Sequence, residues 1–267
     1  MSDKKFSAGL TLWVLLVVGL VIIVGISFID DIKIGDYTVR KGTFKETLLA
    51  DIPEEIPADS LAMLDSLALK EEKVVAEPDT TVKSVMIFGD SMTVLIARRL
   101  AAYGQQNGFK VHSITWDGSS TIAWANLDTL NKYIPEFKPD FFFVSLGGNE
   151  LFLKDVDSRI PHIKKIIDRF EGKPFVWVGP PNWKEDFGYN DMLERTLPKG
   201  TFFKSDGIPL DRGPDHIHPT PKAGGLWTDS IMRWMAHSAH PILAELPDST
   251  VKNAPFTHIY IRVKRKN

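Results

Sequence analysis

The chain has 267 residues and no cysteine, which excludes disulfides, thiol catalysis and cysteine-ligated metal. Its formal net charge is −2 at pH 7, so the charge balance gives no indication of a nucleic-acid partner. Charged residues make up 25% and hydrophobic residues 43%, as in folded proteins, and the length suits one domain of moderate size with appendages.

The first predicted element is a membrane anchor. Residues 6–29 carry no charge and consist mainly of Leu, Val and Ile. As a helix rising about 1.5 Å per residue they would reach roughly 35 Å, enough to cross a hydrocarbon core of about 30 Å. A secretory signal has a shorter apolar core, of about 7–15 residues, and a small-residue cleavage site that residues 25–27 match poorly.

Lys4 and Lys5 precede this apolar run, and positive charge tends to stay on the cytoplasmic side. The sequence therefore predicts a single-pass protein of the cell membrane. Residues 1–29 would be the cytoplasmic N-terminus and the transmembrane anchor, and everything after them would be periplasmic or extracellular.

Residues 30–83 are expected to form a stalk or linker with minor structure. Apolar residues that alternate from Ile32 to Val39 flank Gly35-Asp36, a pattern typical of a small hairpin. Ser60 is placed to cap a short helix that carries three leucines. The polar remainder is expected to be partly disordered.

From residue 84 onward, strands and helices alternate. The predicted strands are short apolar runs at Ser84–Phe88, Lys110–Thr115, Phe141–Leu146, Pro174–Val178 and Thr201–Phe203. Two helices are predicted from apolar stripes, one through Ile160, Ile163, Ile167 and Phe170 and one through Ala223, Trp227, Ile231 and Trp234. This alternation predicts an α/β domain at residues 84–240, with a parallel sheet covered by helices on both faces.

The strand Ser84–Phe88 leads directly into Gly89-Asp90-Ser91. Ser91 therefore lies where a strand turns into a helix, which exposes its hydroxyl and directs backbone N–H groups toward a ligand. An activated serine needs such a position. Taken alone, Gly-Asp-Ser is more often a helix cap.

Serine chemistry also needs a base and an acid that orients the base. Asp215 precedes His218 by three residues, so its carboxylate can fold back onto the imidazole in a tight loop, which Pro219 ends before a helix. On these residues alone, a surface loop or a metal-ligand pair of His216 and His218 is an equal alternative.

Two loops that follow predicted strands offer donors for an oxyanion. The pair Gly147-Gly148 lets backbone approach a ligand closely, and Asn149 after it presents a neutral amide. Gly118, after the strand Lys110–Thr115, would offer its N–H. Gly-Gly-Asn taken alone is equally a simple turn.

These blocks in this order resemble the SGNH hydrolases, also called GDSL esterases and lipases. The resemblance spans about residues 84–238 and runs through Gly89-Asp90-Ser91, Gly118, Gly147-Gly148-Asn149 and Asp215 to His218. It implies a three-layer α/β/α flavodoxin-like fold in which Ser91 is the nucleophile, His218 the base and Asp215 the orienting acid. The implied oxyanion donors are the Ser91 N–H, the Gly118 N–H and the Asn149 side chain.

One residue departs from the family pattern. Glu150 stands where the family often has Asp, which bears on the substrate more than on the activity. No metal and no cofactor are expected.

Other candidate residues are weaker. Three histidines are expected to be structural or mere neighbours of the base: His112, His162 and His216. Three tryptophans near the expected site have rings that could stack on a sugar, although core packing is the commoner fate: Trp116, Trp124 and Trp183. Residues 241–267 are assigned to a C-terminal extension, in which 257–263 alternate like a strand. Its basic end is read as a solvated tail, with contact to anionic envelope polymer or lipid as an alternative.

The sequence thus predicts a membrane-anchored serine esterase that hydrolyses acyl, above all acetyl, esters through an acyl-serine intermediate. Its location favours acylated envelope polysaccharide as the substrate. Two alternatives stay open: an O-acyltransferase with the same triad, and an inactive envelope scaffold or glycan-binding protein. The presence of all four residues of the constellation argues against a scaffold. Hydrolase and transferase differ only in whether water or an acceptor reaches the acyl-enzyme.

Overall fold

The computed structural model describes residues 31–34, 37–40, 77–242, 247 and 254–261. The predicted anchor at residues 6–29 and the helix predicted after Ser60 lie outside these residues. The chain divides into two units, Met1–Pro53 and Glu54–Asn267. In the first unit, β1 (Asp31–Ile34) pairs antiparallel with β2 (Tyr37–Arg40), which confirms the predicted hairpin. Within the described ranges no helix is long and apolar enough to cross a membrane.

The second unit alternates strands and helices, as predicted. Its strands are β3 (Ser84–Gly89), β4 (Lys110–Trp116), β5 (Phe141–Ser145), β6 (Phe175–Val178), β7 (Phe202–Phe203) and β8 (Thr257–Ile261). Its helices are α4 (Thr93–Asn107), α5 (Thr121–Asn126), α6 (Thr129–Phe137), the 3-10 turn η1 (Val156–Arg159), α7 (Ile160–Asp168), α8 (Tyr189–Thr196) and α9 (Pro221–Met235). For each of the five strands predicted before residue 240, the predicted first and last residues lie within one residue of the observed ones.

The six strands form one sheet in the order β7-β6-β5-β3-β4-β8, and every neighbouring pair is parallel. Apart from β8, this is the strand order of flavodoxin-like sheets. In such a sheet the chain reverses its direction of travel between the first and third strands, here β3 and β5. Loops that leave these two strands diverge and open a crevice at the carboxyl edge, which is where ligands bind in folds of this kind.

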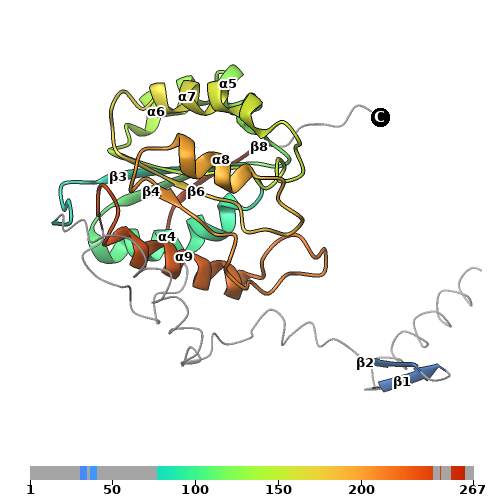
Figure 1. Ribbon diagram of the computed structural model, residues 1–267. Helices are drawn as coiled ribbons and strands as arrows, with labels where there is room; N and C mark the ends of the chain where they lie inside the picture. Colours follow the sequence, from blue (N-terminus) through green and yellow to red (C-terminus); the bar gives the residue numbers. More distant parts are fainter. Residues whose placement is uncertain (1–30, 35–36, 41–76, 243–246, 248–253, 262–267) are drawn as a thin grey trace, which may run out of the picture. The chain divides into compact units, whose positions relative to one another are not determined.

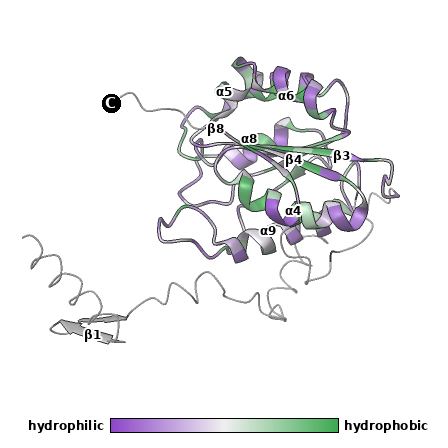
Figure 2. Ribbon diagram, turned by 180° about the vertical axis from the view of Figure 1, so that it is seen from behind, coloured by the Kyte–Doolittle hydropathy of each residue, from purple (hydrophilic) through white to green (hydrophobic). Residues whose placement is uncertain are grey.

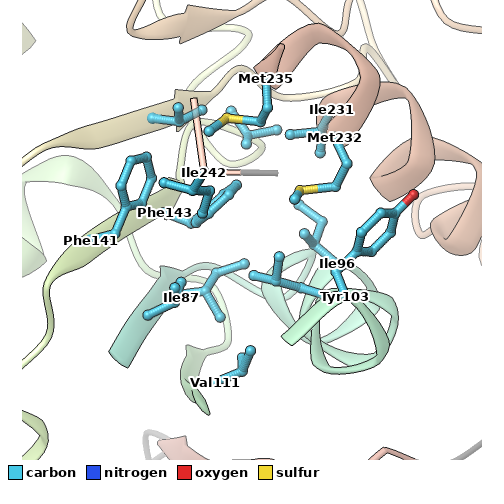
Figure 3. Close-up of a cluster of buried hydrophobic side chains, with 14 of the residues drawn as sticks. Ile87, Ile96, Tyr103, Val111, Phe141, Phe143, Ile231, Met232, Met235 and Ile242 are labelled. Carbon is cyan, nitrogen blue, oxygen red and sulfur yellow. The ribbon is translucent and has the colours of Figure 1, made fainter. Parts of the chain in front are cut away.

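Helices cover both faces of the sheet (Figure 1). On one face, α4 and α9 pack over a buried cluster, part of which Figure 3 shows: Ile87 of β3, Ile96 of α4, Phe141 and Phe143 of β5, and Ile231, Met232 and Met235 of α9. On the other face, α5 to α8 cover a second cluster built around Phe88, Trp124, Phe142, Phe170 and Trp177. The strands between the layers are hydrophobic, whereas the outer helices carry hydrophilic residues (Figure 2). The predicted covered parallel sheet is confirmed.

The chain beyond residue 240 differs from the expected extension, because β8 is part of the sheet. It pairs in parallel with β4, with Tyr260 opposite Thr115. Ile259 and Ile261 pack against the second core cluster. Alternation of apolar and polar residues predicted this strand, and its apolar face is partly buried at the sheet edge next to β4.

Strands β3 and β5 leave no room for a side chain between them where both end. A Cβ atom on Gly89 would lie 1.8 Å from the carbonyl oxygen of Ser145, and Gly89 has φ +156°. The next residue, Asp90, donates its backbone N–H to the same carbonyl oxygen at 3.0 Å. Glycine is therefore required at the end of β3 for the turn toward Ser91 to form.

We predict that Gly89→Ala lowers the free energy of unfolding by about 3 kcal/mol or more, because the added methyl group overlaps main chain that cannot move alone. Urea denaturation of the full-length protein measures this. Gly225→Ala is the matched control: it lies in α9 with open space around its Cβ. There alanine is expected to be neutral or to stabilise the protein by up to about 1 kcal/mol. Equal stabilities of the two variants would contradict the prediction.

Candidate active site

The predicted site residues come together at the carboxyl edge of the sheet. A cavity of about 510 Å³ opens there over the ends of β3, β5, β4 and β8. Its lining includes residues from each predicted block and one residue of the C-terminal strand: Ser91, Gly118, Asn149, His218 and Tyr260. This is the crevice that the strand order predicts.

The candidate triad is joined by two hydrogen bonds. The His218 ring nitrogen Nε2 lies 2.7 Å from Ser91 Oγ, and its Nδ1 lies 2.6 Å from Asp215 Oδ2. A carboxylate can only accept, so Nδ1 carries a proton, and in that tautomer Nε2 is the acceptor for the serine hydroxyl. This is the geometry in which an imidazole can remove the hydroxyl proton.

The loop that carries Asp215 and His218 is fixed by its own hydrogen bonds. Asp215 Oδ1 accepts from the backbone N–H groups of Ile217 and His218, each at 3.0 Å. The Gly213 N–H donates to the His218 carbonyl oxygen at 2.8 Å. The Arg212 guanidinium donates to the carbonyl oxygen of Ile217 and, at 3.2 Å, to that of Asn182. These hydrogen bonds fix the backbone of the loop on both sides of His218, although the loop lies at the surface.

Helix α9 begins directly after this loop. Its first turn is capped by Thr220, whose hydroxyl accepts from the Ala223 N–H at 3.2 Å, and Pro221 occupies the first helical position. The sequence Pro-Thr-Pro therefore sets the start of α9, and with it the position of His218 just before the helix.

Asp90 connects the nucleophile turn to the loop after β5. Its side chain is buried, with Oδ1 accepting from the Met92 N–H and Oδ2 from the Gly148 N–H, both at 3.0 Å. Asp90 thus makes the cap-like contact that Gly-Asp-Ser commonly makes, whereas Ser91 Oγ is turned to His218 instead. Burial raises the pKa of the Asp90 carboxyl to about 6, more than its backbone hydrogen bonds lower it.

The expected oxyanion donors line the cavity beside Ser91. Gly118 has φ +66° and lies at the tip of the loop after β4. The Asn149 amide donates one hydrogen to the Ser119 carbonyl oxygen at 3.0 Å, which fixes its orientation and leaves its second N–H. The structure brings these groups to one place, and their role toward an oxyanion stays a prediction.

Glu150 anchors the Asn149 loop beneath the cavity. Its buried carboxylate accepts from Thr121 N–H and Oγ1 at 3.0 and 2.8 Å, from Arg159 Nε at 2.7 Å and from Tyr189 Oη at 3.2 Å. These partners belong to α5, η1 and α8. Sequence reasoning connected Glu150 with the substrate, but its contacts are with the protein. Burial and the Glu150 charge raise the pKa of Tyr189 well above its ordinary value, so its hydroxyl remains a donor.

Asp215 has the opposite electrostatic environment. The hydrogen bond from His218 and two backbone N–H groups hold its pKa well below the ordinary range. The carboxylate therefore stays ionised and keeps the imidazole in the tautomer described above.

The weaker candidates divide between the core, the surface and the site. His216 is exposed, has φ +57° and is outside the lining of the cavity. Trp124 and Trp116 are buried in the core, whereas Trp183 lines the cavity and donates from its indole nitrogen to the Gly148 carbonyl oxygen at 2.8 Å. His112 stacks on a phenylalanine ring of α6. Among the described residues, no three His, Asp or Glu side chains converge as a metal site.

Two polar residues of the cavity lining escaped sequence reasoning, Asp117 and Tyr260. Asp117 neighbours Gly118 in the loop after β4 and therefore had a positional signal. Tyr260 had none, because only the pairing of β8 with β4 brings it to the site.

No protein-family model matches the chain, and no curated protein matches it. The strand order of the domain is that of flavodoxin-like sheets, with β8 added at one edge. Among solved structures, the chain is similar to one from Desulfitobacterium hafniense DCB-2 that is provisionally described as a lipolytic protein of the G-D-S-L family. The two share 12% identity with a TM-score of 0.42, over 56% of this chain and 98% of the other. So distant a likeness has no bearing on substrate or residue roles.

We predict that Asp90 makes stability fall as the pH rises from about 4 to about 6. In this range the folded protein keeps the Asp90 proton, whereas the unfolded chain, with a pKa near 3.8, has lost it. The contribution is fully present below about pH 4, and its loss above pH 6 amounts to about 3 kcal/mol. Urea denaturation across this range measures the slope. Asp90→Asn should remove it, and an unchanged slope in that variant would contradict the prediction.

Proposed function

We propose that the protein is a serine esterase that cleaves acyl esters through an acyl-serine intermediate. The observation that carries this proposal is the hydrogen-bonded chain from Asp215 through His218 to Ser91 Oγ, which opens on a cavity. A serine without such a base is a poor nucleophile near neutral pH.

In the proposed reaction, His218 Nε2 accepts the proton of Ser91 while Oγ forms a bond to the acyl carbon. The carbonyl oxygen gains the negative charge, and the backbone N–H groups of Ser91 and Gly118 and the side-chain amide of Asn149 stabilise it. His218 then returns the proton to the departing alcohol oxygen as its bond to the acyl carbon breaks. Water repeats the sequence, which releases the acid and restores the Ser91 hydroxyl. Asp215 stabilises the imidazolium that exists between the proton transfers.

The proposal also covers the location of the protein in the cell and the substrate of the enzyme. Residues 6–29 would anchor the protein in the membrane with the catalytic domain outside the cytoplasm, near the polymers of the cell envelope. Acetyl esters on envelope polysaccharide are the proposed substrates. This step rests on the uncharged N-terminal sequence and on what the family resemblance implies.

We predict that Ser91→Ala abolishes labelling of the full-length protein by a fluorophosphonate, because only an activated hydroxyl attacks that reagent. On para-nitrophenyl acetate, Ser91→Ala and His218→Ala should each lower kcat/KM by at least about a thousandfold. Asp215→Ala should also lower kcat/KM strongly. Circular dichroism checks that each variant is folded.

His216→Asn is the matched control, since it changes a histidine of the same loop and asparagine tolerates a positive φ. It should stay within about tenfold of the wild type. Labelling that persists without Ser91, or a His218→Ala variant within about tenfold of the wild type, would refute the triad. Acetyl transfer to an added sugar in preference to water would make the protein an O-acyltransferase instead.

We predict that protease added to cells with an exposed inner membrane removes the catalytic domain, because the domain would lie outside the cytoplasm. The N-terminal residues should remain with the membrane fraction. Immunoblotting with antibodies against each end measures both. Complete protection of residues 84–267, or a mature N-terminus near residue 30, would contradict the proposed topology.

A further inference from the structure

The catalytic cavity contains a polar pair that takes no part in the proposed ester chemistry. Asp117 follows β4 and Tyr260 lies on β8, and both line the same cavity as Ser91. The Tyr260 hydroxyl donates a hydrogen bond to Asp117 Oδ2. The two side chains thus form one unit, although 143 residues separate them in the sequence.

This pair lies at one end of the cavity. Strands β5, β3, β4 and β8 are consecutive in the sheet, so β5 and β8 are about 14 Å apart at the usual strand spacing. Ser91 follows β3, between them. Trp183, bonded to the Gly148 carbonyl after β5, lies toward the other end. The cavity therefore has an aromatic ring on each side of the nucleophile.

The pair can recognise only certain ligands. Because the phenol hydrogen is given to Asp117, the pair presents the Asp117 carboxylate to the cavity as a hydrogen-bond acceptor, which calls for a ligand that donates hydrogen bonds. An acyl chain laid against the pair would desolvate the carboxylate without compensation, and an anionic group would be repelled by it. The Tyr260 ring, 41% exposed, adds an apolar surface beside these acceptors.

We propose that Asp117 and Tyr260 form a subsite for a sugar ring of the substrate, so that the esters cleaved here are carbohydrate esters. A sugar ring carries hydroxyl donors on its rim and apolar C–H groups on its face, which match the acceptor pair and the tyrosine ring. The inference rests on the proposed esterase function and names the residues that would hold the alcohol part of its substrate.

The subsite is formed before a ligand arrives. Tyr260 is held in the sheet opposite Thr115, and its ring meets the edge of His258 at 5.8 Å and 89°. His258 Nε2 in turn lies 3.3 Å from Thr115 Oγ1. Binding a sugar would therefore immobilise few side chains, which favours affinity.

Two esters with the same acetyl group test the subsite in the full-length protein: para-nitrophenyl acetate and a monoacetylated methyl glucoside. Tyr260→Phe should raise KM for the sugar ester about fivefold and Asp117→Asn at least tenfold, because each removes a hydrogen-bonding group from the subsite. The kcat/KM for para-nitrophenyl acetate should stay within about twofold. Tyr133→Phe, a tyrosine on α6 outside the cavity lining, is the matched control and should change neither.

Binding gives a readout that does not require turnover. In a Ser91→Ala background, quenching of tryptophan fluorescence by the monoacetylated methyl glucoside should give a Kd that Tyr260→Phe weakens about fivefold. If the wild type cleaves neither ester, the proposed esterase function fails, whereas this Kd still decides the subsite.

Three outcomes would overturn the subsite. An equal fall in kcat/KM for both esters would mean that the pair merely supports the Gly118 loop. Unchanged KM and Kd for the sugar ester would mean that the pair does not contact the sugar. Faster cleavage of acetylcholine than of the sugar ester, lost in Asp117→Asn, would assign the pair to a cationic group.

Discussion

The site depends on one buried carboxylate, that of Asp90. It joins the turn after β3 to the loop after β5, through the Met92 and Gly148 N–H groups. These are the two strands at which the sheet reverses its direction of travel, so their loops diverge. Each oxygen of the carboxyl group accepts one of the two N–H groups, and such hydrogen bonds are strongest when the group is ionised. The raised pKa of Asp90 is the cost of placing that charge in the interior.

Like Asp90, Glu150 is a buried carboxylate that joins separate segments of the domain. Its partners Thr121, Arg159 and Tyr189 come from three separate elements, and one of them, Arg159, is a cation that compensates the buried charge. The shorter side chain of aspartate would not reach all of these partners from the same backbone position. Glutamate here therefore follows from how α5, η1 and α8 pack, and carries no information about the substrate.

Local sequence was sufficient for the strands and for the pair of Asp215 and His218, because each depends on residues near in the chain. The contact of His218 with Ser91, 127 residues away, was expected only from the family resemblance. Apolar runs set the strands, and Asp215 and His218 meet within one turn of a loop. Contacts between distant segments were not predictable in this way. The alternation around Tyr260 indicated a strand but not its neighbour in the sheet, since nothing local to residues 257–261 specifies β4 as the partner. The network of Glu150 was hidden for the same reason.

The two kinds of carboxylate in the site illustrate how environment separates their tasks. Asp90 and Glu150 are almost fully buried and act on the positions of loops, whereas the side chain of Asp215 is 48% exposed. Exposure keeps Asp215 solvated, and the backbone N–H groups around it favour the charged form further. An acid that must remain ionised beside an imidazole that gains and loses a proton is better placed at the surface than in the core. The rigidity that burial would provide comes instead from the hydrogen bonds of Arg212 and from the capped start of α9.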